Sequence, residues 1–483
     1  MESREERLRR LCREHGQEHL WAYWDRLSAA ERDAFLEDVE RVPFTELPTL
    51  REIVRGRGGA THGFRSIEPP ICVRRPEKES DDPRRRRGES LLRDSRVAAF
   101  TVAGGQGTRL GFDGPKGAFA ISPVRGKPLF QLFAEQIIAT DRRYGGATHW
   151  YIMTSDANDS ETRAFFERQN HFGLAADRVI FFRQGSMPAF STDGRILLDQ
   201  PGRLALSPDG HGGSLLALAR SGVLAQMAAS GIEYVSYFQV DNPMVRCLDP
   251  FFLGLHVESR SDMSSKMVPK ATDDEKVGLF AQCDGKLQVL EYSDLPAGLA
   301  SARNSEGSRK FDAGSIAIHV LSRSFIERLT ADPARFRLPW HRAMKKVPHV
   351  ALPAPGQSCE PAWPPQRIEP AAPNAVKLEA FVFDALPLAA NPVVLETNRR
   401  EEFSPVKNAT GVDSVATAKR DLSDRAARWL AAAGCNIPRA VPGVSDGEFE
   451  GVYEISSLRA MQAEDLRDNR PLPRITDAAV YVE

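Results

Sequence analysis

The sequence predicts an α/β fold built around a largely parallel sheet. Short apolar runs of the kind found in buried strands alternate along the chain with segments whose apolar residues recur at helical spacing. The strand-like runs are 97–103, 149–154, 178–183 and 233–240. Helices are predicted over 129–140 and over 214–231, with Gly231 ending the second as a C-cap. This alternation of strand and helix is typical of parallel sheets covered by helices.

Three consecutive regions are predicted along the chain. Its 483 residues are 42% hydrophobic, which is enough to bury a large core. Residues 1–90 are expected to form an N-terminal helical module and a charged linker, since the apolar residues of 3–57 recur at helical spacing. Residues 91–437 are expected to form the central domain. Residues 438–483 are expected to form a small C-terminal module, in which 449–457 has the pattern of a strand.

The segment 74–90 is almost wholly charged and is interrupted by proline, so we expect an exposed connector there. Its four consecutive arginines, Arg84 to Arg87, have the charge to bind nucleic acid or a membrane surface. Acidic residues flank the run, however, and the formal net charge of the chain is -1, so a solvated linker is the favoured interpretation. A second, proline-rich segment, 352–373, is predicted to be a surface loop.

Charge and cysteine usage narrow the class of protein. The near-neutral charge gives no reason to expect nucleic acid or an anionic membrane as a partner, so any phosphate site must be local. The six cysteines are scattered and form no CxxC pair, which argues against a zinc site or a disulfide framework and favours a reducing compartment. The N-terminus has no apolar signal core, and no uninterrupted apolar stretch reaches the roughly 18 residues of a membrane span. We therefore expect a cytoplasmic protein.

The segment 103–117, AGGQGTRLGFDGPKG, follows the first predicted strand directly, where an α/β domain has its first strand-to-helix loop. Its glycines let the backbone approach a polyphosphate closely, while Arg109 and Lys116 supply positive charge. The segment lacks the glycine spacing of the dinucleotide fingerprint, and the chain has no P-loop motif. A purely structural glycine turn is the alternative, but such a turn requires neither the lysine nor the arginine. The segment therefore predicts a phosphate-binding loop.

Asp241 is the best candidate for a magnesium ligand. It follows the apolar run 233–240, which places its carboxylate at the carboxyl end of a strand, where open α/β sheets bind ligands. Magnesium usually takes one or two carboxylates together with phosphate oxygens and waters, so one aspartate suffices. The alternative is that Asp241 only caps the turn through Asn242 and Pro243.

The loop GGQGTRLG and the following PKG resemble the signature of the eukaryotic-type UDP-sugar pyrophosphorylases, and most closely that of their UDP-N-acetylhexosamine branch. Further segments match this family in the same order: 207-SPDGHGG, 240-VDN, 291-EYSDL, 311-FDAGSIA, 377-KLEAFVFD and 402-EFSPVKN. The resemblance spans residues 16–430. It implies a doubly wound α/β nucleotidyltransferase domain of the GT-A/Rossmann-like type between small N- and C-terminal domains. It also implies a magnesium-dependent uridylyltransferase whose partners are UTP and a sugar 1-phosphate.

The resemblance also assigns the site residues. The residues 103–105 would meet the uracil and the ribose, and Lys116 would neutralise the α-phosphate. The predicted nucleotide-binding residues are Ala103, Gly104, Gly105, Gly107, Thr108, Lys116, Gln184, Gly210, Asp241 and Lys377. The predicted sugar-phosphate-binding residues are His211, Glu291, Tyr292, Ser315 and Lys407. Attack of one phosphate on another needs charge stabilisation and in-line positioning without a covalent intermediate. This role is assigned to Arg109, Lys116 and Lys407.

Two departures from the N-acetylhexosamine branch concern the sugar. His211 stands where that branch usually has an asparagine that touches the sugar, and Ser315 stands where an asparagine bonds the N-acetyl group. UDP-glucose and broad-specificity relatives typically carry the GHG sequence that surrounds His211. We therefore expect N-acetylglucosamine 1-phosphate as the leading substrate and glucose 1-phosphate as the alternative. A catalytically silent nucleotide-binding relative is a third possibility, disfavoured because Lys116 and Asp241 are both present.

Overall fold

The computed structural model describes residues 2–57, 63–76, 78–292, 295–296, 298–351, 363–440, 447–468, 470–472 and 478–483. The chain forms two compact units, each assembled from three separate segments. Unit 1 contains Met1–Gly63, Gln184–Leu216 and Arg337–Asp384; unit 2 contains Phe64–Arg183, Ala217–Phe336 and Ala385–Glu483. Each unit therefore combines segments that are far apart in the sequence, whereas three consecutive regions were predicted. Pairing between the strands of these segments joins them within a unit.

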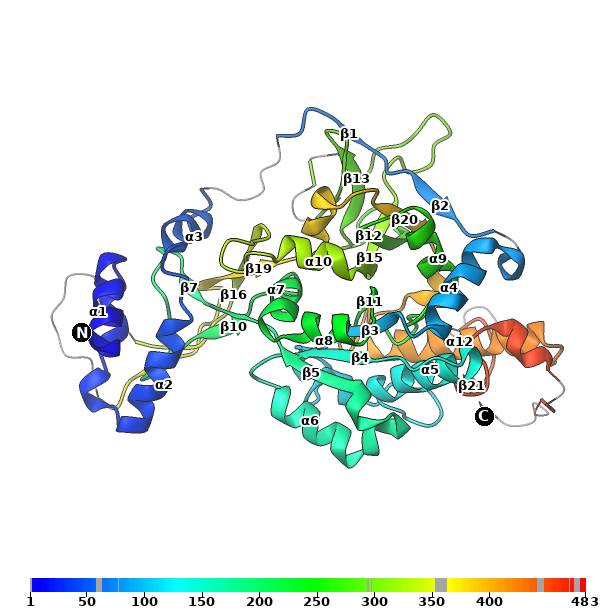
Figure 1. Cartoon of the computed structure of the whole chain (residues 1–483), viewed down its shortest axis with the longest axis horizontal. Coiled ribbons are helices and arrows are strands. Elements are labelled where there is room, and N and C mark those ends of the chain that lie inside the picture. Colours follow the sequence, from blue (N-terminus) through cyan, green and yellow to red (C-terminus); the bar gives the residue numbers. More distant parts are fainter. Residues whose placement is uncertain are drawn as a thin grey trace. The chain divides into compact units, whose positions relative to one another are not determined.

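Unit 2 is built on an 11-stranded sheet, and all four predicted strands lie side by side in it (Figure 1). The main path of the sheet runs β2 (Cys72–Arg74), β20 (Val393–Glu396), β12 (Met263–Pro269), β15 (Ala313–Ser322), β11 (Tyr234–Gln239), β3 (Val97–Val102), β4 (Trp150–Thr154) and β5 (Val179–Arg183). β1 (Ile67–Glu68), β13 (Leu279–Cys283) and β14 (Lys286–Leu290) extend it. The pairs β11–β3, β3–β4 and β4–β5 are parallel, whereas β15 is antiparallel to both of its neighbours on this path. The predicted α/β fold with a largely parallel sheet is confirmed.

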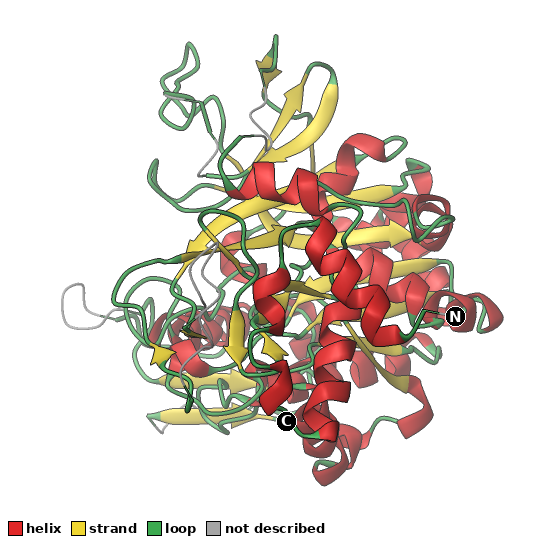
Figure 2. Ribbon diagram, turned by 90° about the vertical axis from the view of Figure 1, so that its left-hand side faces the viewer, coloured by secondary structure: helices red, strands yellow, loops and turns green. Residues whose placement is uncertain are grey.

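Helices cover this sheet (Figure 2), and their buried faces supply its core. The helices of unit 2 include α4 (Pro83–Arg93), α5 (Leu129–Tyr144), α6 (Asp159–Arg168), α8 (Val223–Ala229), α9 (Pro250–Glu258), α10 (Arg323–Leu329), α11 (Arg399–Glu402) and α12 (Val415–Ala432). The predicted helix over 129–140 is confirmed as α5. The predicted helix over 214–231 is two helices, α7 (Gly213–Arg220) and α8, because Gly222 has a φ of 79°, which α-helices do not contain.

The prediction of an exposed connector over residues 74–90 is wrong. Most of its second half forms α4, which packs closely on α9. A Cβ atom added at Gly88 would lie 1.8 Å from the carbonyl oxygen of Pro250, and one added at Gly254 would lie 1.7 Å from that of Arg84. Composition suggested a solvated linker, but glycines at the contact allow the two helix backbones to approach and bury this side of the helix.

The charges of this segment also have partners inside unit 2. Arg75, whose side chain is only 17% exposed, pairs with Asp249, with Glu79 at 2.8 Å and with Glu402 at 3.1 Å. Lys266 is fully buried between Asp249 and Glu402. Buried charges are tolerated where each is paired, so the Arg75 part of this charged segment belongs to the folded interior, while Arg74, Arg86 and Arg87 are exposed.

Unit 1 combines the N-terminal helices with small antiparallel sheets. Its helices include α1 (Arg4–Glu14), α2 (Ala29–Glu40) and α3 (Leu47–Val54). Its strands are β6 (Ser186–Pro188), β7 (Phe190–Ser191), β8 (Leu198–Gln200), β9 (Arg203–Leu204), β10 (Leu206–Pro208), β16 (Trp340–Lys345), β17 (His349–Val350), β18 (Arg367–Ile368) and β19 (Ala375–Ala380). β19 pairs with both β16 and β7, and the buried faces of the helices share one apolar core with these strands. Of the predicted proline-rich loop, residues 352–362 lie outside the described residues.

The C-terminal part of unit 2 has a small core of its own around the end of α12. The strand predicted at 449–457 is confirmed as β21 (Val452–Ile455), which pairs in parallel with β22 (Ala479–Val482). In the parts of the chain that the structure describes, no helix is long and apolar enough to cross a membrane.

Candidate active site

The predicted phosphate-binding loop begins where β3 ends and folds back on itself. The amide of Lys116 donates to the carbonyl oxygen of Gly105 at 3.1 Å, and the amide of Gly107 donates to that of Gly114 at 2.8 Å. A Cβ atom added at Gly107 would lie 2.6 Å from the Phe112 ring, so this glycine has a packing role. A Cβ atom at Gly105 would meet nothing within 4 Å, so this side of the loop is open to a ligand.

Three side chains of the loop, those of Thr108, Arg109 and Lys116, can meet a ligand, whereas the Gln106 side chain donates to the carbonyl oxygen of Ala157 at 3.0 Å. Thr108 and Arg109 are the exposed residues of a single 3-10 turn, Thr108–Leu110, and Lys116 is half-buried. Among the residues that the structure describes, neither Arg109 nor Lys116 forms an ion pair. Two uncommitted cations beside an open glycine backbone are the features expected of a site for a polyphosphate.

Ser155 and Asn158, which follow β4, also belong to this loop structure. They donate hydrogen bonds to the carbonyl groups of Ala103, Gly104 and Gly105. Neither residue could be predicted from the sequence, because a serine and an asparagine after a strand are common in any turn. The only available signal in the sequence was their position directly after the strand-like run 149–154. This run is the next predicted strand after the one that precedes the loop.

The register of the sheet brings Asp241 to the same edge as the loop. β11 and β3 are parallel neighbours in which Gln239 pairs with Val102, so both chains leave the sheet together. The carboxylate of Asp241 is half-buried, and in the described part of the chain it makes no hydrogen bond or ion pair. The turn is capped instead by Asn242, whose Oδ1 accepts from the amides of Met244 at 3.3 Å and Ser404 at 3.2 Å. The alternative that Asp241 serves only as a turn cap is therefore disfavoured.

The environment of Asp241 fits a magnesium ion. In the described residues no group of three or more His, Cys, Asp or Glu side chains could hold a metal by itself. Magnesium does not need such a group, because it binds through one or two carboxylates plus substrate phosphates and waters. An unpartnered carboxylate at the edge of the sheet beside a phosphate-binding loop meets this requirement.

Lys407 lies beside Asp241. The amide of Val406 donates to the carbonyl oxygen of Asp241 at 2.8 Å, which attaches the Lys407 segment to the end of β11. The Lys407 ammonium is 3.5 Å from a carboxylate oxygen of Asp413, and both side chains are partly exposed. A cavity of ≈ 450 Å³ is lined by residues that precede and follow Lys407 in the sequence, including Pro405 and Asp413.

Two predicted sugar-binding residues, Glu291 and Ser315, meet around Gly278 in unit 2. The amide of Ser315 donates to the carbonyl oxygen of Gly278 at 2.8 Å. A Cβ atom added to Gly278 would lie 3.0 Å from a carboxylate oxygen of Glu291. Tyr292 is 49% exposed, which is unusual for a large ring and leaves it accessible to a ligand. Ser293 and Asp294, which belong to the same sequence segment, lie outside the described residues.

Unit 1 brings together Gln184 and Gly210 around Asp209. The buried Gln184 amide approaches the Asp209 carboxylate at 3.5 Å, and the backbone of Asp209 bonds to that of Ala380 at 2.8 Å. Gly210 has a φ of 87°, and a Cβ atom there would lie 2.3 Å from the carbonyl oxygen of Ala380. Only glycine fits this position, so Gly210 is required by the local fold as well as by the predicted contact.

His211 is held against aromatic rings in unit 1. Its ring is stacked on that of Phe381, with 5.1 Å between centroids, and its Nδ1 accepts the amide of Val382 at 3.2 Å. Desolvation, assisted by the nearby His341, lowers the pKa of His211 to about 4. The neutral ring therefore carries its proton on Nε2, which makes His211 a hydrogen-bond donor and not a cation at pH 7.

Lys377 lies in β19 of unit 1 and is half-buried. Burial lowers its pKa, while Glu379 on the same strand partly opposes the shift. In the part of the chain that the structure describes, Lys377 forms no ion pair. A half-buried ammonium without a partner is costly unless an anionic ligand compensates it.

The predicted residues therefore form separate groups in the two units. In unit 2 the glycine loop, Asp241 and Lys407 share one edge of the sheet, and Glu291 and Ser315 form a second group. Unit 1 holds Gln184, Gly210, His211 and Lys377.

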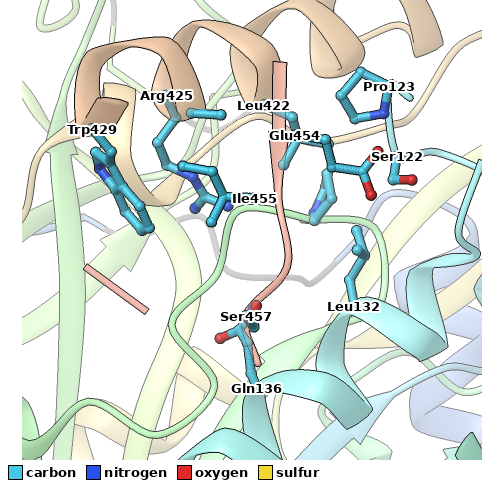
Figure 3. Close-up of a pocket in the computed structure, with 12 residues that line it drawn as sticks. Ser122, Pro123, Leu132, Gln136, Leu422, Arg425, Trp429, Glu454, Ile455 and Ser457 are labelled. Atoms are coloured by element: carbon cyan, nitrogen blue, oxygen red, sulfur yellow. The ribbon is translucent and has the colours of Figure 1, made fainter. Parts of the chain in front are cut away.

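A further pocket of ≈ 40 Å³ lies between α5, α12 and β21 (Figure 3). Glu454 enters it from β21, and Arg425 and Trp429 enter from α12. One oxygen of Glu454 accepts the amides of Val124 and Arg125 at 2.8 Å. None of the predicted site residues lines this pocket.

Comparison with known proteins identifies a family and several relatives of this chain. The model of the family described as UTP–glucose-1-phosphate uridylyltransferase matches residues 75–422. "UDP-N-acetylhexosamine pyrophosphorylase-like protein 1" of Xenopus tropicalis is 36% identical, over 96% of this chain and 94% of that protein. "UDP-N-acetylglucosamine diphosphorylase 2" of Arabidopsis thaliana is 33% identical, over 94% of this chain and 89% of that protein.

A solved structure with a similar fold extends over the whole chain. The uridine diphosphate N-acetylglucosamine pyrophosphorylase from Trypanosoma brucei, in complex with an inhibitor, has a TM-score of 0.77 and 26% sequence identity. The match covers 100% of this chain and 98% of that one.

Proposed function

The chain belongs to the UTP–glucose-1-phosphate uridylyltransferase family, a family of UDP-sugar pyrophosphorylases, and on that premise we propose that it joins UTP to N-acetylglucosamine 1-phosphate. The products are UDP-N-acetylglucosamine and pyrophosphate. The observation that carries the proposal is the register of β3 and β11. It places a glycine-rich loop with two cations beside an aspartate, and none of these three side chains has an ionic partner among the described residues. The names of the relatives, at 33–36% identity over nearly the whole chain, support the sugar.

The reaction is one displacement at the α-phosphorus of UTP. A phosphate oxygen of the sugar 1-phosphate forms a new bond to this phosphorus, and the bond to the pyrophosphate leaving group breaks. Lys116 and Arg109 lower the barrier by stabilising charge on the triphosphate, and Lys407 orients the attacking phosphate. Asp241 would hold a magnesium ion together with phosphate oxygens, and the ion would supply further positive charge at the phosphates.

Nucleotide recognition is proposed for the backbone of 103–105, with Gly107 and Thr108 at the phosphates. Gln184 has the neutral amide suited to reading a uracil edge, and Gly210 lies close to it in unit 1. Lys377 is proposed to approach the phosphates as well. We further propose a reducing, cytoplasmic setting, which is supported by the free state of the five cysteines that the structure describes.

Glucose 1-phosphate is a second candidate substrate. Ser315 offers one hydroxyl where an amide is expected to bond the N-acetyl group, and the loss of one hydrogen bond is worth about 0.5–1.5 kcal/mol. The neutral His211 ring offers one donor, where an asparagine amide has both a donor and an acceptor. These differences reduce the preference for the N-acetylated sugar without abolishing it.

The test is pyrophosphate release by the purified protein from UTP with each of several sugar 1-phosphates. We expect the highest kcat/KM with N-acetylglucosamine 1-phosphate, measurable turnover with glucose 1-phosphate and little turnover when ATP replaces UTP. Lys116→Ala serves as the matched inactive variant. Absence of pyrophosphate release with every sugar would refute the proposal and favour a silent nucleotide-binding protein.

A further inference from the structure

We propose that Asn158 and Ser155 are positioning residues for nucleotide binding. They fix the carbonyl groups of residues 103–105, so that the amides of the same peptide units face the nucleotide. The inference rests on the proposed function, since it concerns how that site holds UTP. Neither side chain need touch the nucleotide, because each acts through the backbone of the loop.

Three successive carbonyl groups of the loop are bound by these two side chains. The Asn158 amide donates to the oxygen of Ala103 at 2.9 Å and to that of Gly105 at 3.2 Å. The Ser155 hydroxyl donates to the oxygen of Gly104 at 2.8 Å. Every peptide unit from Ala103 to Gln106 is therefore oriented by one side-chain hydrogen bond.

The opposite side of the same peptide units is left free. In a trans peptide the N–H group points away from the C=O group, so the amides of Gly104, Gly105 and Gln106 face away from Asn158 and Ser155. In the described residues these three amides donate to no protein acceptor. A run of successive free amides forms an electropositive backbone surface for ligand oxygen atoms. The open space at Gly105 leaves room for a ligand there.

The asparagine is suited to this task because its polar atoms are all in use. Its Oδ1 accepts the amide of Ser155 at 2.9 Å, while its two N–H groups serve the loop. These bonds fix the orientation of the side-chain amide. In the flipped orientation its oxygen would face two carbonyl oxygens of the loop, which is unfavourable. Asn158 is fully buried and Ser155 is 3% exposed, so water cannot readily replace these bonds.

The topology explains why this turn reaches the loop. Ser155 follows β4 directly and Asn158 precedes α6, and β4 is the parallel neighbour of β3. The two chains therefore leave the sheet side by side. A bond from the Gln106 side chain to the carbonyl oxygen of Ala157, at 3.0 Å, adds a further link between the loop and the turn.

The experiment compares Asn158→Ala and Ser155→Ala with the wild type in steady-state kinetics. With two hydrogen bonds to the loop removed, we expect Asn158→Ala to raise KM for UTP about tenfold. We expect a smaller rise for Ser155→Ala, recovery in Ser155→Thr, and KM for the sugar 1-phosphate within about twofold of wild type in each. Arg163→Ala, which removes an exposed side chain of α6, is the matched control and should leave both KM values unchanged.

Hydrogen exchange supplies a second readout. In the wild type, UTP should slow exchange at the amides of residues 104–106, and this protection should fall in Asn158→Ala and Ser155→Ala. Variants that lose only thermal stability, with KM for UTP and protection unchanged, would overturn the inference. Ser155→Ala decides the matter if Asn158→Ala does not fold. A wild type that neither binds nor consumes UTP would instead refute the proposed function, and the inference with it.

Discussion

The ammonium nitrogen of Lys407 lies 3.5 Å from a carboxylate oxygen of Asp413, and the residue before Lys407 is bonded through its backbone to Asp241. The lysine is thus attached to the proposed metal ligand and paired, in the absence of substrate, with a partly exposed carboxylate. An exposed pair of this kind is worth about 0–1 kcal/mol, so a phosphate can displace Asp413 easily.

Lys407→Ala is accordingly expected to lower kcat by about a hundredfold, because the attacking phosphate loses its orienting charge. Asp413→Asn is the matched comparison and should change kcat/KM by less than about fivefold, since only the weak exposed pair is lost. The effects of both substitutions are measured from initial rates of pyrophosphate release. Equal effects of the two substitutions would mean that the pair, and not the lysine alone, serves the reaction.

Asp241→Asn is expected to collapse activity at low magnesium and to recover part of it as the magnesium concentration rises. The substitution keeps the size of the side chain but removes the negative charge that attracts a hard cation. The measurement is a titration of turnover with magnesium for both proteins, with thermal melting as the control for folding. An unchanged magnesium dependence would point to a different ligand.

His211→Asn combined with Ser315→Asn is expected to raise the ratio of kcat/KM for N-acetylglucosamine 1-phosphate over glucose 1-phosphate. One restored hydrogen bond of about 0.5–1.5 kcal/mol corresponds to roughly a threefold to tenfold change in this ratio. Each single variant separates the two contributions. If the double variant gains nothing toward the N-acetylated sugar, these positions do not set the specificity.

Gly88→Ala is expected to lower the free energy of unfolding by about 1–3 kcal/mol, because the added methyl group overlaps the backbone of α9. Arg87→Ala, at the exposed neighbouring position, should change it by less than about 0.5 kcal/mol. Urea denaturation measures both. Equal stability of the two variants would contradict the close packing of α4 on α9 and restore the view of this segment as a dispensable connector.

Stability is expected to fall as the pH decreases from 7 to 5, in part because of His256. Burial lowers the pKa of this histidine from 6.5 to about 3, and its two ring nitrogens are bonded to Ser264 and Ser322. The folded state thus keeps the ring neutral while the unfolded chain takes up a proton below pH 6.5. By linkage, this difference in protonation lowers the free energy of unfolding by about 2 kcal/mol at pH 5. Urea denaturation of the wild type and of His256→Gln at both pH values measures this loss of stability. An equal pH dependence in the two proteins would exclude His256 as its cause.

The sequence predicted the sheet of unit 2 well, because each of its central strands is a short apolar run with clear ends. The glycine loop and Asp241 could also be placed in advance, since both directly follow such runs and parallel strands bring their carboxyl ends together. The helical break at Gly222 was missed because a single glycine is often tolerated within a helix.

The remaining errors concern contacts between distant segments. The charged residues around Arg75 looked solvated because their partners, Asp249 and Glu402, lie far along the chain. Nothing local marks Asn158 as a residue that holds the loop. Likewise, the neutral state of His211 depends on rings near residue 381 that only the pairing of distant segments supplies.

The interleaved make-up of unit 1 has a consequence for synthesis and for protein engineering. Its N-terminal helices share a core with β19, so they cannot complete their packing until residues 337–384 have left the ribosome, after most of unit 2 has been made. Cutting the gene at one place therefore cannot yield unit 1 whole, and a fragment of residues 1–90 would expose the apolar faces that β7 and β19 normally cover. To isolate either unit, its three segments would have to be joined to one another by new linkers.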